Sequence, residues 1–330
     1  MSETVEFRRA IREALDEELA RDERVVFFGE DVAAPGGVFA VTPGLQERHG
    51  ERRVFDTPIA ELAICGSAFG AAIGGLRPVV EIMFGDFLQL AMDPLVNHAS
   101  KYWYLSNEQA SIPIVVRSAV GGGGRFGAIH SQMPAGWFQN VPGLKIVAPA
   151  TVHDAKALLK AAVRDDNPVL FLEHKRLYGM KGERGGGEVL APLGVAEIVR
   201  RGGDLTIVTA MSRVHDCLAA AEELRGDGIE CEVIDLRTLR PLDMDTVLAS
   251  VARTNRVVVV EEGPRTGGWS AQVLADVCEQ ALDELDAAWR IATPDHPIPY
   301  SPPLEDAFYG VAQIAARIRE HLGIAAAARG

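Results

Sequence analysis

The stretch of sequence that most constrains the fold is Asp56-Thr57-Pro58-Ile59-Ala60-Glu61-Leu62-Ala63-Ile64-Cys65-Gly66-Ser67-Ala68-Phe69-Gly70-Ala71-Ala72-Ile73-Gly74-Gly75-Leu76. Glu61 stands before a run without charge that reaches Leu76. Pro58 suits the first position of a helix, and Thr57 suits the cap before it. We therefore predict a helix that starts at Pro58, is buried nearly all round and carries a single acid near its start.

Glu61 has two interpretations on local spacing. A carboxylate beside apolar walls is poorly solvated and is suited to exchange a proton near neutral pH. The alternative is an acid that favours the positive end of the helix macrodipole, which is common at helix starts. The local pattern alone does not separate a functional acid from a stabilising one.

Three glycines in this predicted helix, Gly66, Gly70 and Gly74, recur at every fourth residue and so form one stripe. Each costs about 1 kcal/mol relative to alanine inside a helix, so the stripe needs a structural reason. Such a stripe lets a second backbone approach closely. A membrane span is excluded because it needs roughly 20 apolar residues. We predict a helix packed at a deep interface, such as one between subunits, with Glu61 at its rim.

Buried strands alternate with helices along most of the chain. Continuous apolar runs, which are typical of parallel strands covered on both faces, occur at residues 25–29, 78–83, 112–117, 145–149, 168–173, 205–209, 231–236 and 256–261. A glycine-rich segment divides these runs into two groups. We predict an α/β protein with two doubly wound domains, in which residues 1–180 form the first domain, 181–190 the linker and 191–330 the second domain.

The composition excludes several classes of function. The chain has 330 residues, 48% of them apolar, and a net charge of -13. This acidity argues against nucleic acid or an anionic membrane as a partner but suits a basic protein. The four cysteines show no metal-binding spacing, so reduced thiols fit best. The N-terminal segment lacks a signal core and a transit pattern, and we expect a bacterial cytoplasmic protein.

Two glycine-rich segments invite a phosphate-binding interpretation. Residues 121–127 follow a predicted strand but open no helix, so we interpret them as a flexible loop that brings His130 to a ligand. An ordinary loop histidine is the alternative. Gly226-Asp227-Gly228, with Asn255 downstream, resembles the magnesium-diphosphate motif of thiamine enzymes. We reject it because it ends a helix and precedes a strand, whereas a diphosphate site needs the reverse order.

Several motifs together are typical of a known family: Thr57-Pro58-Ile59-Ala60-Glu61, His130-Ser131-Gln132 and Pro142-Gly143-Leu144-Lys145-Ile146-Val147. Further matches lie at residues 74–78, 164–168, 232–238 and 241–243. Nearly end to end, the chain resembles the beta subunit of the thiamine diphosphate-dependent first component of 2-oxoacid dehydrogenase complexes. Pyruvate, branched-chain 2-oxoacid and acetoin dehydrogenases share this subunit. The resemblance implies a pyrimidine-binding domain followed by a transketolase C-terminal-like domain.

The resemblance also implies roles for single residues. Glu61 would bond the ring nitrogen of the cofactor's aminopyrimidine and stabilise the imino tautomer that generates the nucleophilic ylid. Phe87 and Leu62 would lie against the cofactor, and His130 would face the substrate and the lipoyl group and transfer protons. Oxygens that would hold a potassium ion belong to Ile114, Ala162, Val163, Asp165 and Asn167. A helix end closed by Asp165 and Asn167 explains those residues equally well.

We therefore expect an obligate catalytic subunit for oxidative decarboxylation of a 2-oxoacid, pyruvate or branched-chain, with acyl transfer to a lipoyl acyltransferase core. The resemblance implies an alpha-2 beta-2 heterotetramer, with Mg²⁺ and the diphosphate on the alpha subunit. Segments 173–179 and 297–301 resemble acetoin-type members, so an acetoin dehydrogenase beta subunit is one alternative. A noncatalytic scaffold is another, and a nucleotide-binding protein is disfavoured because no Gly-x-Gly-x-x-Gly motif is in context.

Overall fold

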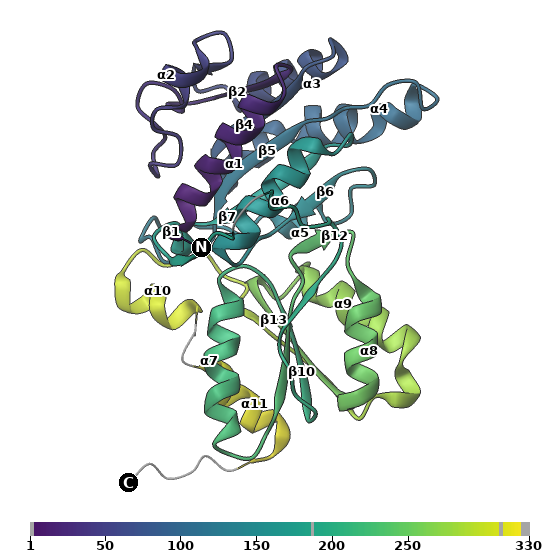
Figure 1. Ribbon diagram of the computed structural model, residues 1–330. Coiled ribbons are helices and arrows are strands. Elements are labelled where there is room, and N and C mark those ends of the chain that lie inside the picture. The colour runs from purple at the N-terminus through teal and green to yellow at the C-terminus, as the bar shows by residue number, and fades with distance from the viewer. Residues whose placement is uncertain (1–2, 186–187, 310–312, 325–330) are drawn as a thin grey trace.

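The computed structural model describes residues 3–185, 188–309 and 313–324 and shows two α/β domains in contact, each with helices packed on a central sheet (Figure 1). The first sheet has seven strands in the order β12-β6-β7-β5-β4-β2-β3, and the second has five strands in the order β14-β13-β10-β11-β9. The expected fold class, two doubly wound α/β domains, is confirmed. Within the described residues, no helix is long and apolar enough to cross a membrane.

The elements of the N-terminal half follow the predicted alternation. They are β1 (Thr4–Glu6), α1 (Phe7–Arg21), β2 (Val25–Gly29), α2 (Leu45–His49), β3 (Val54–Asp56), α3 (Glu61–Ile73), β4 (Arg77–Phe84), η1 (Gly85–Ala91), η2 (Asp93–Ala99), α4 (Ser100–Leu105), β5 (Val115–Val120), α5 (Ala135–Phe138), β6 (Lys145–Val147), α6 (Val152–Arg164), β7 (Val169–His174), η3 (Lys175–Leu177) and β8 (Lys181–Glu183).

The C-terminal half repeats the alternation on a smaller scale. Its elements are β9 (Glu197–Arg200), β10 (Leu205–Thr209), α7 (Arg213–Arg225), β11 (Cys231–Asp235), β12 (Thr238–Arg240), α8 (Met244–Thr254), β13 (Arg256–Pro264), α9 (Trp269–Gln280), η4 (Leu282–Glu284), β14 (Ala287–Thr293), α10 (Pro302–Tyr309) and α11 (Ile314–Leu322).

Helices cover both faces of the larger sheet. Along β2, Val25 and Phe27 point into the apolar cluster formed with α1 and α6, whereas Val26 and Phe28 point into the cluster formed with α3 and η1. This alternation follows from the two-residue period of a strand. It explains why both kinds of position are apolar in a sheet that is buried on both faces.

The start of α3 differs from the prediction. The helix begins at Glu61 after Ala60, which has φ -162° and ψ 70° and provides no side-chain cap. The reason is a backbone bond from Thr57 N to Gly29 O of 2.8 Å, which ties the preceding segment to the end of β2. The chain is thereby held out of a helical conformation before Glu61. Pro58 therefore does not open the helix, and Thr57 does not cap it.

The prediction that α3 is buried nearly all round is also wrong for the single chain. Ile64, Cys65, Ala68 and Ala72 are buried against the sheet, but Leu62 is 56% exposed. An ideal Cβ added at Gly66 or Gly70 would meet nothing within 4 Å. The glycine stripe therefore lies on an uncovered face of the helix.

Two strand pairings were not predicted, and the second of them connects the domains. Strand β8, inside the segment expected to be linker, pairs antiparallel with β1. Strand β12, from the C-terminal half, joins the edge of the larger sheet by pairing antiparallel with β6. One apolar cluster consequently contains residues of both halves, including Ile146 and Leu239.

A buried ion cluster crosses three strands of the larger sheet. The Arg117 guanidinium donates to Glu173 Oε1 and Oε2 (2.7 and 2.8 Å) and to Glu81 Oε2 (2.7 Å). Burial raises the pKa of Glu81 although Arg117 opposes this shift. One cation thus pairs with two buried carboxylates.

We expect Arg117→Met to lower the free energy of unfolding by about 3–5 kcal/mol, because it leaves two buried carboxylates without a cation. Urea unfolding measures this loss. Arg9→Met is the matched control, since Arg9 pairs with Glu13 at an exposed site, and such a pair contributes about 0–1 kcal/mol. Equal losses in the two variants would contradict this account of the cluster.

Candidate active site

The topology brings three of the predicted site residues to one edge of the larger sheet. Strands β5, β4, β2 and β3 are neighbours and run parallel, so their carboxyl ends share this edge. Glu61 follows β3, Phe87 follows β4, and His130 lies in the loop after β5. Ligands of open α/β sheets bind outside such carboxyl ends.

Glu61 is half-buried at the N-terminal end of α3, and its neighbours along the chain, Ile59 and Leu62, have exposed side chains. Burial raises the pKa of Glu30, at the end of β2, and the charges of Asp31 and Glu61 raise it further. Burial together with the Glu61 charge raises the pKa of Cys65 to about 12. Glu61 therefore places a carboxylate at an apolar rim that already carries other acids.

Two phenylalanines hold the ring of His130. The ring centroid lies 4.8 Å from that of Phe84 and 5.3 Å from that of Phe87, with interplanar angles of 88° and 85°. These edge-to-face contacts are favourable for aromatic rings. Phe87 lies in η1, which packs against α3, so Phe87 connects the His130 segment with the Glu61 helix.

The glycine loop before His130 is fixed by the C-terminal domain. Gly122 N donates to Glu262 Oε1 at 2.7 Å, and Gly123 N donates to Glu305 Oε1 at 3.0 Å. Arg125 Nη1 donates to Glu305 Oε2 at 2.7 Å. Figure 1 shows α10, which carries Glu305, at the junction of the two domains. The loop is therefore anchored at several points, and its residues do not form a phosphate-binding turn.

Glu262 is a buried carboxylate shared between the domains. His174 Nε2 lies 2.9 Å from its Oε2, and Arg213 Nη2 lies 3.2 Å from the same oxygen. Burial alone would raise the pKa of Glu262, but the charges of His174 and Arg213 outweigh it and hold that pKa well below its usual range. A Cβ at Gly121 would lie 2.2 Å from His174 Nε2, which explains the glycine that follows β5.

The sequence patterns did not predict roles for Glu262 and Glu305. Glu262 could have been noticed, because Glu261 and Glu262 interrupt an apolar run at the end of a predicted strand. Acids at such positions are buried and need partners. Their partners, however, lie 140 and 182 positions away along the chain.

The rejected diphosphate motif has the structure expected of a turn. Gly226 is the C-cap of α7, and Asn255 is the left-handed C-cap of α8, with φ 57°. Within the described parts of the chain, no cluster of three or more His, Cys, Asp or Glu side chains could hold a metal ion. The four cysteines are unpaired.

The residues that are expected to bind potassium lie at the amino ends of the strands, on the side of the sheet opposite to Glu61 and His130. Ile114 precedes β5, Asn167 precedes β7, and the others surround the end of α6: Ala162, Val163 and Asp165. Arg77 donates to the main-chain oxygens of Val163 (2.9 Å) and Asp165 (2.6 Å). Each carbonyl oxygen keeps a second lone pair, so this donor set fits a hard cation.

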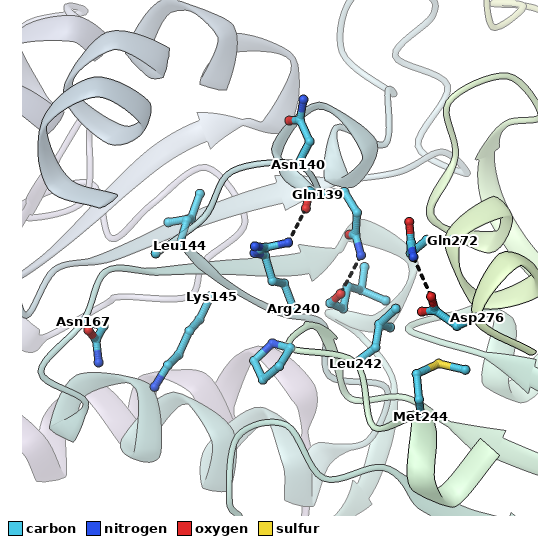
Figure 2. Close-up of a pocket in the computed structure, with 13 residues that line it drawn as sticks. Gln139, Asn140, Leu144, Lys145, Asn167, Arg240, Leu242, Met244, Gln272 and Asp276 are labelled. Carbon is cyan, nitrogen blue, oxygen red and sulfur yellow. Dashed lines mark hydrogen bonds between the residues drawn. The ribbon is translucent and has the colours of Figure 1, made fainter. Parts of the chain in front are cut away.

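Two cavities lie between the domains. One of about 720 Å³ is bordered by α5 and β6 on one side and by β12, α8 and α9 on the other (Figure 2). In it Arg240 donates to Gln139 O at 2.7 Å and Gln139 Nε2 donates to Leu239 O at 2.8 Å. The other cavity, of about 700 Å³, is lined by Ile129 and Ser131, the neighbours of His130, and by residues of the C-terminal domain.

Comparison with known proteins defines the class of this chain. Residues 3–181 match the transketolase pyrimidine-binding domain, and residues 194–314 match the transketolase C-terminal domain. A solved structure described as a split-gene transketolase in an inactive beta4 tetramer superposes with a TM-score of 0.80 over 97% of this chain and 99% of that one. At 21% sequence identity this likeness concerns the fold alone.

Curated relatives narrow the class to one family. The acetoin:2,6-dichlorophenolindophenol oxidoreductase subunit beta of Cupriavidus necator is 45% identical over 97% of this chain and 98% of its own length. The 2-oxoisovalerate dehydrogenase subunit beta of Bacillus subtilis is 47% identical (91% and 92% covered), and the pyruvate dehydrogenase E1 component subunit beta of Rickettsia felis is 46% identical (90% and 92%). The chain belongs to this family of beta subunits, as its motifs predicted.

We expect Glu305→Gln to speed trypsin cleavage after Arg125 at least about tenfold, because hydrogen bonds to a charged group contribute about 1.5–3 kcal/mol. Mass spectrometry of the fragments measures the rate of this cut in the folded chain. Asp306→Asn is the control, since exposed Asp306 also pairs with Arg125 but does not hold the loop backbone. Similar rates in both variants would show that Glu305 does not anchor the loop.

Proposed function

We propose that this chain is the beta subunit of a thiamine diphosphate-dependent 2-oxoacid dehydrogenase and that Glu61 activates the cofactor. The observation that carries the proposal is a carboxylate at an apolar rim, on the sheet edge that also presents Phe87 and His130. The family relationship supports the same reading of these residues.

When bound, thiamine diphosphate supplies the carbon nucleophile that attacks the 2-oxo group. Glu61 would accept a hydrogen bond from the pyrimidine ring nitrogen, and a charged acceptor does this strongly where water is excluded. Phe87 and Leu62 would border the ring and exclude that water. An imidazole nitrogen of His130, whose ring the two phenylalanines orient, would exchange a proton with the substrate or the lipoyl group.

We infer that an alpha subunit covers the exposed face of α3 and supplies Mg²⁺ and the diphosphate site. Gly66 and Gly70 leave space there for a second backbone. Most of the exposed large apolar side chains lie between residues 38 and 137, including Trp103 and Tyr104 at the end of α4. Apolar surface of this kind marks a protein interface. An alpha-2 beta-2 assembly would complete the active site, and sedimentation of the co-expressed chains tests it.

The reaction proposed is oxidative decarboxylation of a 2-oxoacid, with transfer of the acyl group to a lipoyl group on an acyltransferase core. The C-terminal domain would dock that core, and the net charge of -13 suits a basic docking module. Cleavage of acetoin is the second candidate, which the identity to the Cupriavidus necator subunit favours.

We also infer a bacterial cytoplasmic location, because all four cysteines are unpaired, and cell fractionation tests this.

We further propose that potassium binds at the end of α6. A bound ion stabilises the native state by mass action, so replacing Na⁺ with K⁺ at equal ionic strength should raise the Tm by about 1–2 °C for each kcal/mol of linkage. Differential scanning calorimetry measures the shift. Identical melting curves in the two salts would argue that Arg77 alone neutralises these oxygens.

We expect Glu61→Gln to lower kcat/KM more than about a hundredfold with the preferred substrate, since loss of a cofactor-activating contact costs several kcal/mol. The assay uses the complex with the alpha subunit and compares pyruvate, a branched-chain 2-oxoacid and acetoin. Glu47→Gln is the control, because exposed Glu47 is also a first-turn helix acid. Activity of Glu61→Gln within about threefold of wild type would instead favour the scaffold.

A further inference from the structure

The loop that carries His130 has no regular secondary structure from Gly121 to Pro134, so contacts from other elements must hold His130 in place. Glu262 and Glu305 anchor only its first residues. Phe84 and Phe87 contact the imidazole ring but cannot fix the backbone below it. The backbone N–H of His130 makes a long bond of 3.5 Å to Gly127 O. On the other side of His130, Gln132 N donates to Asp86 Oδ1 at 3.2 Å and Gln132 O accepts from Gly121 N at 3.1 Å. Between these two sets of anchors, the main-chain oxygen of His130 is the contact that holds the backbone of His130 itself.

Lys175 supplies the donor to that oxygen. It is the first residue after β7, and its Nζ donates to His130 O. The same ammonium group lies 5.4 Å from the ring centroid of Phe84 and 5.3 Å from that of Phe126. A cation over aromatic faces is attracted by their negative quadrupole. Lys175 is thus held over Phe126 and over Phe84, which also contacts the His130 ring, and it is hydrogen-bonded to the His130 backbone.

We propose that Lys175 is a positioning residue whose ammonium group fixes the His130 backbone and, through it, the direction of the imidazole. The inference deepens the proposed function, because it rests on the role of His130 there. Lys175 touches neither the proposed cofactor contact Glu61 nor Phe87 in the described contacts, so it acts through His130.

The protonation state of Lys175 should control the strength of its hydrogen bond to His130 O. Burial lowers the pKa of Lys175 to about 8, although the charges of Asp86, Glu262 and Glu305 oppose the shift. Above that pH the group is a neutral amine, which is a weaker hydrogen-bond donor and is not attracted to aromatic faces as a cation. The His130 backbone is therefore released as the pH rises through about 8.

Global stability should change in the opposite direction. The folded-state pKa of Lys175 lies below the ordinary lysine pKa of 10.5, so folding disfavours the charged form. Its burial penalty is complete below about pH 8 and disappears as the pH rises toward 10.5. A loosened His130 loop above pH 8, without a loss of stability from this group, distinguishes local release from general unfolding.

The experiment compares wild type with Lys175→Met, Lys175→Arg and Lys101→Met. Lys101 is the matched control, because its Nζ also donates to a main-chain oxygen, that of Pro142, at 3.0 Å. Hydrogen exchange of the peptide 126–133 is measured on the full chain at pH 7. Turnover of the complex with the alpha subunit is measured from pH 7 to 9.5.

Lys175→Met should increase exchange in residues 126–133 and lower kcat about ten- to hundredfold at pH 7, with KM nearly unchanged, because a misplaced group costs rate rather than binding. Lys175→Arg should restore protection and move the alkaline loss of activity from about pH 8 to above about pH 9, since guanidinium does not deprotonate there. Lys101→Met should resemble wild type in both measurements.

The proposal would be overturned if residues 126–133 exchanged equally fast in Lys175→Met and Lys101→Met. It would also be overturned if Lys175→Arg lost activity at the same alkaline pH as wild type. If Lys175→Met does not fold, the comparison of Lys175→Arg with wild type still tests the proposal. Only the positioning role predicts that the pH at which activity is lost rises in Lys175→Arg. An inactive wild-type complex would refute the proposed function, yet the exchange data would still test the contact between Lys175 and His130.

Discussion

The structure depends on one carboxylate, Glu262, that both domains share. A buried charge is costly unless it is paired and hydrogen-bonded. Glu262 meets this requirement only when Gly122 and His174 of the N-terminal domain and Arg213 of the C-terminal domain surround it together. The two sheets must therefore dock for the loop after β5 to take its shape. The C-terminal domain thus contributes to the shape of the candidate active site, because its residues hold the loop that carries His130.

A second constraint is the uncovered face of α3. An apolar helix face with glycines at its centre is unfavourable in water, and the single chain leaves it exposed. Glu61 lies at the edge of this face, where a second chain would remove its water and make its charge a stronger hydrogen-bond acceptor. The proposed alpha subunit would cover this surface, which would account for both the exposed apolar face and the position of the carboxylate at its rim.

Local patterns in the sequence predicted much of the fold. The apolar runs that became β2, β4 and β7 are continuous because the sheet is covered on both faces. The start of α3 was mispredicted because a bond from Thr57 to the end of β2 overrides the helix preference of Pro58. Strand β12 could not be predicted, since three residues carry no periodic signal and their partner β6 belongs to the other domain. The motifs predicted Glu61 and His130 as site residues, but the anchors Glu262, Glu305 and Lys175 depend on distant contacts that no local spacing reveals.

The most direct test of the central claim is the rate at which the thiazolium proton of bound thiamine diphosphate exchanges with deuterium. This rate, measured by NMR after rapid quenching, reports cofactor activation before any substrate is added. We expect fast exchange in the complex of this chain with its proposed alpha subunit, and exchange slower by more than about a hundredfold in Glu61→Gln. Equal exchange rates in the two complexes would contradict the central claim.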